Sequence, residues 1–214
     1  MLLIGMFDSP FVRRVAISMR RLGLAFDHAN WSVGVDFDRI RQYSPLGRVP
    51  VLVLEDGAVL IESAAILDAI DDLVGPGRAL LPAAGPSRRE ALRLMSLAVG
   101  AGEKARDQLY ERMVRPREKY HEPWVERCRE QMHGALGQLE SSCAQRSSSE
   151  WLVDDRLTQA DITVTCLCSF LDDSLQVFGT AHAYPSLESV VHRCEALPEF
   201  QATRARWFAA EMQS

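Results

Sequence analysis

The stretch of sequence that most constrains the fold runs from residue 44 to residue 63 and reads SPLGRVPVLVLEDGAVLIES. It opens with Ser, Pro and Gly, which favour a turn. Two apolar segments, 51–54 and 58–61, then flank the tripeptide EDG, a pattern typical of a β-hairpin. A helical pattern over residues 62–73 follows directly. The stretch therefore predicts a turn, two antiparallel strands and a helix.

The residues before this stretch predict two further strands and two helices. Residues 2–7 form an apolar run typical of a buried strand, and Ser9-Pro10 favours a helix start. Residues 26–31 predict a second strand, and residues 36–43 predict a short helix. The order over residues 1–76 is therefore βαβαββα, a small mixed sheet with helices on both faces.

A cluster of Gly and Pro residues after the sheet domain marks a change of architecture. We predict a linker at 77–86, between a domain at 1–76 and a domain at 87–214. Beyond the linker the sequence predicts helices over 87–115, over 123–146, over 158–175, from Tyr184-Pro185, and from Leu197-Pro198 to near Gln213. The fold class is thus α/β plus all-α.

Composition excludes several classes of protein. The chain has 214 residues, with 24 Lys and Arg against 29 Asp and Glu, a formal net charge of −5. Neither predicted domain has the basic excess that nucleic-acid binding requires. No apolar run approaches the roughly 18 residues of a membrane-spanning helix, and the N-terminus does not resemble a signal peptide. We therefore expect a cytoplasmic protein that binds neither nucleic acid nor membrane.

The cysteines and histidines predict no disulfide framework and no metal site. There are five cysteines, an odd number, and no CxxC pair. Cys166 and Cys168 lie in the apolar segment 162–171, where a free cysteine behaves as a small buried hydrophobe. The five histidines form no ligand pair at helical spacing.

Four short motifs occur in order along about 150 residues. They are SPFVRR at 9–14, SPLGRVPVL at 44–52, LIES followed by Ile66, and LTQAD at 157–161. Together they resemble the cytosolic glutathione S-transferases. The resemblance implies a thioredoxin-like N-terminal domain followed by a helical bundle, glutathione as co-substrate, a role in detoxification, and a homodimer.

Ser9 is the candidate catalytic residue. Its hydroxyl and the first N–H groups of the following helix can donate hydrogen bonds to a sulfur anion, which lowers the pKa of a thiol. The alternative is that Ser9 only caps the helix. Met6 and Phe7 precede it where one subgroup of the family has Tyr, and the first Cys is Cys128. The resemblance is therefore to serine-type members, which favours conjugation over disulfide chemistry.

The resemblance places glutathione on five residues of the first domain: Arg48, Val49, Pro50, Glu62 and Ser63. Val49-Pro50 resembles the family's cis-proline step, whose backbone pairs with the cysteinyl main chain. Arg48 is a candidate for the glycine carboxylate, Ser63 for the γ-glutamyl carboxylate, and Glu62 for the γ-glutamyl amine. The alternatives are a strand-initiating Pro50, a solvated Arg48, and a capping role for Glu62 and Ser63.

The second substrate is expected between the domains. The candidate wall residues are Phe11, Tyr110, Met113, Phe170 and Trp207, although aromatic and Met residues at helical spacing are also typical of a core. Thr158 and Asp161 have capping-box spacing, and we assign them to folding alone. The predicted function is conjugation of the glutathione thiolate to a hydrophobic electrophile. The alternative is a glutathione-binding or regulatory protein with little turnover.

Overall fold

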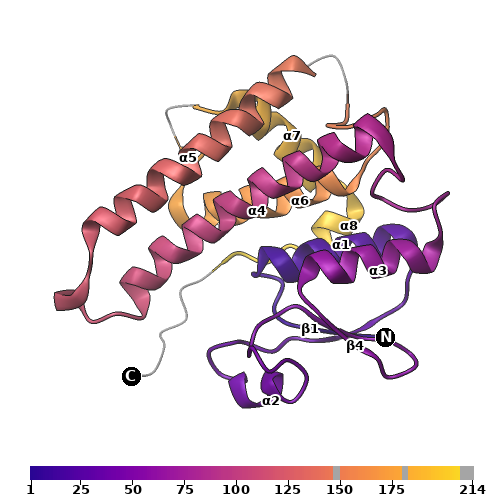
Figure 1. Cartoon of the computed structure of the whole chain (residues 1–214), viewed down its shortest axis with the longest axis horizontal. Helices are drawn as coiled ribbons and strands as arrows, with labels where there is room; N and C mark the ends of the chain where they lie inside the picture. Colours follow the sequence, from indigo (N-terminus) through magenta and orange to yellow (C-terminus); the bar gives the residue numbers. More distant parts are fainter. Residues whose placement is uncertain (147–149, 180–182, 208–214) are drawn as a thin grey trace.

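A computed structural model describes residues 1–146, 150–179 and 183–207. Figure 1 shows a sheet domain built by the first part of the chain and a helical domain built by the rest. The helices α1 (Pro10–Leu22) and α3 (Ser63–Val74) lie between the sheet and the helical domain. They therefore form the layer through which the two domains meet.

The sheet has four short strands: β1 (Leu2–Ile4), β2 (Asp27–Ala29), β3 (Val51–Val53) and β4 (Val59–Ile61). Their order is β2-β1-β3-β4, with β1 parallel to β2 and the other two pairs antiparallel. The hairpin prediction is confirmed. The strand predicted over 2–7 ends earlier, because Gly5 leaves the extended conformation at a φ of 128°.

Helices cover both faces of the sheet, as the sequence predicted. α1 and α3 pack against each other and against the sheet on one face. On the other face lies α2 (Phe37–Arg41), where Ile40 packs on Ile4 and Val51. The alternation of inward-facing residues in β1 follows from the two-residue period of a strand, since Leu3 joins the main core and Ile4 joins the smaller one.

The helical domain contains α4 (Gly85–Met113), α5 (Glu122–Gln145), α6 (Gln159–Leu175), α7 (Pro185–Glu195) and α8 (Pro198–Gln201), with a short 3-10 turn at Arg117–Lys119. The fold class is confirmed. The connection between α3 and α4 is residues 75–84, whereas the linker at 77–86 stays a prediction. The last predicted helix is wrong in extent. α8 ends at Gln201, residues 204–207 are not helical, and Gln213 lies outside the described residues.

α6 is the central helix, and its start is closed by its own side chains. Residues 159–171 of this helix are all buried. The Thr158 hydroxyl accepts a hydrogen bond from the Ala160 N–H at 3.3 Å. The Asp161 carboxylate accepts three bonds of 2.8 Å, from the Leu152 N–H, the Thr158 N–H and the Thr158 hydroxyl. The predicted capping box is therefore present, and Asp161 also ties the preceding loop to the helix.

An arginine on α1 joins the two domains. The Arg13 guanidinium donates two hydrogen bonds of 2.6 Å to the Glu195 carboxylate of α7. It also donates to the Phe200 and Thr203 carbonyls at 3.0 and 3.2 Å. Burial on its own would raise the pKa of Glu195, but Arg13 and its other partners bring that pKa below its usual value of 4.5. Such a bidentate pair fixes both the distance and the orientation of α1 against the helical domain.

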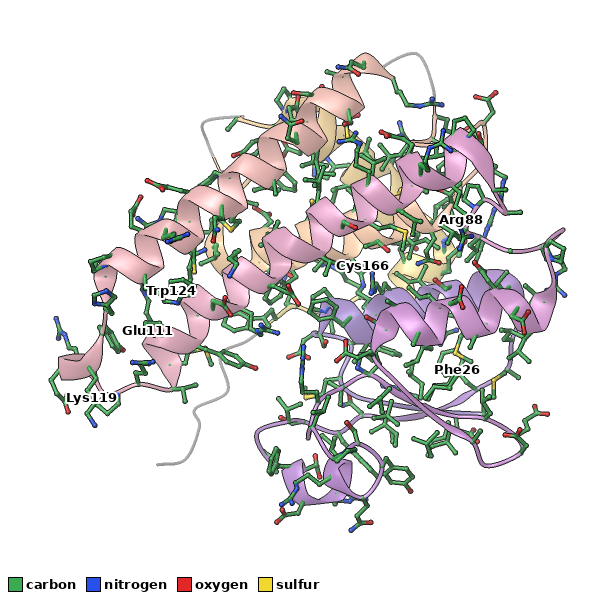
Figure 2. The ribbon with its side chains drawn as sticks, viewed as in Figure 1. Phe26, Arg88, Glu111, Lys119, Trp124 and Cys166 are labelled. Atoms are coloured by element: carbon green, nitrogen blue, oxygen red, sulfur yellow. The ribbon has the colours of Figure 1, made fainter. Side chains whose placement is uncertain are left out.

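The five cysteines are all buried and free. Figure 2 labels Cys166, which lies inside the molecule on α6. Burial raises the pKa of the Cys143, Cys166 and Cys194 thiols to about 12, which leaves them as neutral thiols. The prediction that they act as packing residues is confirmed. In the described part of the chain, no helix is long and apolar enough to cross a membrane.

Candidate functional site

The connection from β1 to α1 is held by a very close approach of three segments. Gly5 has a φ of +128°, and a Cβ atom placed on it would lie 2.6 Å from Val12 Cγ2 and 2.8 Å from Val49 Cβ. Only a residue without a side chain fits there. This contact brings the start of α1 next to the loop that carries Val49.

Ser9 occupies the N-cap position of α1, and its hydroxyl makes no capping hydrogen bond. The first helical bond runs from the Arg13 N–H to the Ser9 carbonyl at 2.9 Å. The N–H groups of the residues between Ser9 and Arg13 have no acceptor within the helix, and Pro10 has no N–H. The helix start therefore keeps its hydrogen-bond donors and its partial positive charge. The side chain of Ser9 is not used as a cap.

A pocket of about 190 Å³ opens beside Ser9 between the two domains. Its lining includes all five predicted wall residues, which come from α1, α4, α6 and the segment after α8: Phe11, Tyr110, Met113, Phe170 and Trp207. The rings of Phe170 and Trp207 meet edge to face, with 6.1 Å between their centroids. The structure thus brings these residues together, and their contact with an electrophile stays a prediction.

Two of the predicted glutathione-binding residues, Arg48 and Val49, line the same pocket. The Val49-Pro50 peptide bond is cis, as the sequence predicted. Pro50 is buried and lies outside the pocket lining. The Arg48 guanidinium lies 3.5 Å from the Glu62 carboxylate, and both side chains are about half exposed. An exposed pair of this kind is weak, so both groups remain able to bind a ligand.

Glu62 and Ser63 form a corner at the start of α3. Glu62 has a φ of 67° and, as the N-cap residue, makes no side-chain capping bond. Ser63 is buried, and its hydroxyl accepts a hydrogen bond of 2.6 Å from the Arg14 guanidinium. Both residues lie outside the lining of the pocket. Arg48 is the link between the pocket and this corner.

Arg14 is a residue whose role sequence reasoning missed. It is buried on α1, donates to Ser63, and has a second, longer contact of 3.4 Å with the Thr163 hydroxyl of α6. In the part of the chain that the structure describes, no carboxylate lies within ion-pair distance of it. Burial therefore lowers the pKa of Arg14 to about 10. The signal in the sequence was an arginine within a helix whose neighbours are mostly apolar.

Other residues of the lining were also missed: Asp8, Trp31, Ser32, Val33, Gly34, Arg106 and Leu109. Burial raises the pKa of Asp8, against the effect of its backbone hydrogen bonds. Trp31 to Gly34 form the loop after β2 and approach Ser9 only in three dimensions. No local pattern in the sequence marks this loop as part of a site.

Fold and site together define a class of protein. A thioredoxin-like domain is joined to a helical domain, with an apolar pocket between them. The first domain contains a cis-proline loop and, at a helix start, a serine whose side chain makes no capping bond. Two family models match the chain. The glutathione S-transferase N-terminal domain matches residues 3–78, and the glutathione S-transferase C-terminal domain matches residues 106–198. The chain belongs to the glutathione S-transferase family.

Individual relatives agree with this assignment. The chain is 27% identical over 203 residues to an uncharacterized GST-like protein, YibF, of Escherichia coli, covering 95% of this chain and 98% of the relative. A glutathione S-transferase from Methylobacterium radiotolerans, solved with glutathione sulfonate, has a TM-score of 0.86 at 27% identity, covering 94% and 93% of the two chains. A glutathione transferase family member from Pseudomonas fluorescens, with bound glutathione, has a TM-score of 0.82 at 29% identity, covering 95% and 98%.

Proposed function

We propose that this protein is a serine-type glutathione transferase, which conjugates the thiolate of glutathione to a hydrophobic electrophile. The observation that carries the proposal is the Ser9 hydroxyl, which makes no capping bond and lines an apolar pocket between the domains. Solved relatives hold glutathione or its sulfonate, which supports the same ligand here.

In the proposed mechanism, the cysteinyl main chain of glutathione pairs with the backbone of Val49 before Pro50. Arg48 binds the glycine carboxylate. Glu62 and Ser63 bind the amine and the carboxylate of the γ-glutamyl group, and Arg14 holds the Ser63 hydroxyl in place. This arrangement directs the thiol toward Ser9.

The Ser9 hydroxyl then donates a hydrogen bond to the sulfur anion, and the start of α1 adds its partial positive charge. Both effects lower the thiol pKa from about 8.5, so a larger share is thiolate at neutral pH. The thiolate attacks the electrophilic carbon, a carbon–sulfur bond forms, and the leaving group departs with its bonding electrons. Phe11, Tyr110, Met113, Phe170 and Trp207 hold the electrophile away from water.

The test combines binding with turnover. Calorimetry measures glutathione binding to the wild type and to Ser9→Ala, and absorbance measures conjugation of 1-chloro-2,4-dinitrobenzene by both. We expect both proteins to bind glutathione and only the wild type to turn over efficiently. Tight binding with no turnover on a panel of electrophiles would favour the alternative, a glutathione-binding or regulatory protein.

We also propose a homodimer. Around α2, large apolar side chains are exposed in an otherwise polar region: Val35 at 83%, Leu46 at 57% and Phe37 at 46%. Exposed apolar groups of this kind favour association. Sedimentation at micromolar concentration should give twice the mass of the chain, and a monomer would contradict the proposal. The five free thiols suit a reducing compartment, which supports the predicted cytoplasmic location.

A further inference from the structure

Two arginines line the pocket, one from each domain. Arg48 comes from the loop before β3 in the first domain, and Arg106 comes from α4 in the second domain. Asp8 is the only acidic residue in the lining of the pocket, as far as the structure describes it. The remaining lining is mostly apolar, so each charge in it is a strong determinant of what binds.

The two arginines have different surroundings. Arg48 lies beside Glu62, at the corner assigned above to glutathione. Arg106 Nη2 lies 3.3 Å from Asp107 Oδ1, and the same Asp107 carboxylate lies 3.0 Å from Lys104 Nζ. One carboxylate therefore faces two cations, and the neighbouring Glu103 also acts on Lys104. Among its described contacts, Arg106 therefore has one acidic partner, Asp107, and shares it with Lys104.

The position of Arg106 along α4 places it in the part of the pocket assigned above to the second substrate. Leu109 and Tyr110 follow it by three and four residues, so they lie on the same face of the helix, and both line the pocket. The Arg106 side chain is 31% exposed, which makes it partly desolvated and strengthens its hydrogen bonds to an anion. The residues assigned to glutathione all lie in the first domain, whereas Arg106 lines the pocket from the second domain.

We propose that Arg106 is a specificity residue, which binds a carboxylate carried by the electrophile. The inference rests on the proposed function and adds the substrate class to it: an apolar electrophile with one negatively charged group. A guanidinium binds carboxylates through two parallel hydrogen bonds. A single guanidinium that already contacts the Asp107 carboxylate matches a singly charged carboxylate better than a doubly charged phosphate.

The first experiment compares two electrophiles with the same ring and leaving group, 4-chloro-3-nitrobenzoate and 4-chloro-3-nitrobenzamide. Each rate is divided by the uncatalysed rate. We expect Arg106→Gln to lower the benzoate-to-benzamide ratio of kcat/KM about 10-fold, and Arg106→Lys to restore part of it. The control is Arg112→Gln, which removes the same charge from an exposed position of α4 outside the pocket lining. An unchanged ratio in Arg106→Gln would overturn the inference.

The second experiment does not depend on turnover. Calorimetry compares S-(4-carboxybenzyl)glutathione with S-(4-carbamoylbenzyl)glutathione on the wild type, Arg106→Gln and Arg112→Gln. The wild type and Arg112→Gln should prefer the carboxylate, and Arg106→Gln should lose that preference. Equal affinity of the wild type for the two conjugates would overturn the inference and leave the proposed function intact. Binding of neither conjugate would overturn both.

Discussion

Among the described helices, α1 and α6 have a serine or threonine at the N-cap position, and the two helix starts are built differently. At α6, Thr158 is fully buried and forms a capping box with Asp161. At α1, Ser9 holds the same N-cap position, makes no capping bond and lines the pocket. The same chemical group closes one helix start and leaves the other available to a ligand.

The difference shows how stability and chemistry are divided between the two sites. The start of α6 is satisfied by residues within nine positions of one another in sequence. α1 instead is held from its flank, where Arg13 binds Glu195 some 180 residues away. Because distant contacts position α1, its first turn can keep free donors for an anion without loss of the helix.

The largest effect on the free energy of unfolding is expected at the start of α6. Replacing Asp161 by Ala leaves three buried donors without an acceptor, so the free energy of unfolding should fall by about 3–5 kcal/mol. A cap alone contributes about 1 kcal/mol, and the additional tie to Leu152 accounts for part of the excess. Urea denaturation measures the change. Asp155→Ala, at an exposed neighbouring position, should stay within about 0.5 kcal/mol. A loss below 1 kcal/mol for Asp161→Ala would contradict the comparison.

At the start of α1, replacing the hydroxyl residue should affect activity strongly and stability little. Ser9→Ala should lower kcat/KM for conjugation about 100-fold, which corresponds to about 2.7 kcal/mol in the barrier. Its free energy of unfolding should change by less than about 0.5 kcal/mol, because no capping bond is lost. Thr158→Ala is the reciprocal control: it should lose about 1 kcal/mol of stability and keep its activity. Equal stability losses in the two variants would contradict the division of roles.

The flank that holds α1 should be sensitive to acid. The pKa of Glu195 in the folded protein lies below its usual 4.5, so its stabilising effect is fully present above pH 4.5 and is lost as the pH falls through the folded-state pKa. Glu195→Gln should reduce the free energy of unfolding by about 2 kcal/mol at pH 7. The difference in free energy of unfolding between wild type and variant should narrow as the pH falls below 4.5 in urea titrations. A gap that does not depend on pH would show that the charge of Glu195 is not what holds α1.

The smallest change in stability is expected when the start of α1 is given a capping side chain. Ser9→Asp places a carboxylate at the N-terminus of α1, where it can accept a hydrogen bond and oppose the partial positive charge. We expect the free energy of unfolding at pH 7 to rise by about 0.5 kcal/mol, while conjugation is lost because the carboxylate repels a thiolate. Ser9→Asn separates the two effects, since it can cap without a charge. A destabilised Ser9→Asp would show that the site does not accept a cap.

The sequence predicted the elements that depend on local patterns. The hairpin around Glu55 to Gly57 and the capping box of α6 occur where turn residues and apolar spacing placed them. The helix predicted from Leu197 ends early, at Gln201, because the chain there packs on α1 and its carbonyls meet Arg13. Helical spacing alone does not reveal such a contact.

The candidate site was predictable where the family motifs describe it and not elsewhere. Ser9, Arg48 and Val49 reach one pocket, as the motifs imply. The contact of Arg14 with Ser63 and the approach of Trp31 join segments that lie far apart in the sequence. Arg106 occupies an ordinary position on a long amphipathic helix. Only the packing of the two domains shows that it faces the pocket.

The long helix α4 has one further consequence. Its small residues Ala98, Ala101 and Ala105 are fully buried in the core. Of the residues that line the pocket from this helix, Arg106 and Met113 are partly buried and Tyr110 is exposed. The three alanines lie outside the pocket lining, whereas Leu109 belongs both to the core and to the lining. Single replacements at Arg106, Tyr110 or Met113 can therefore change which molecules the pocket accepts, while the buried alanines keep the helix in place.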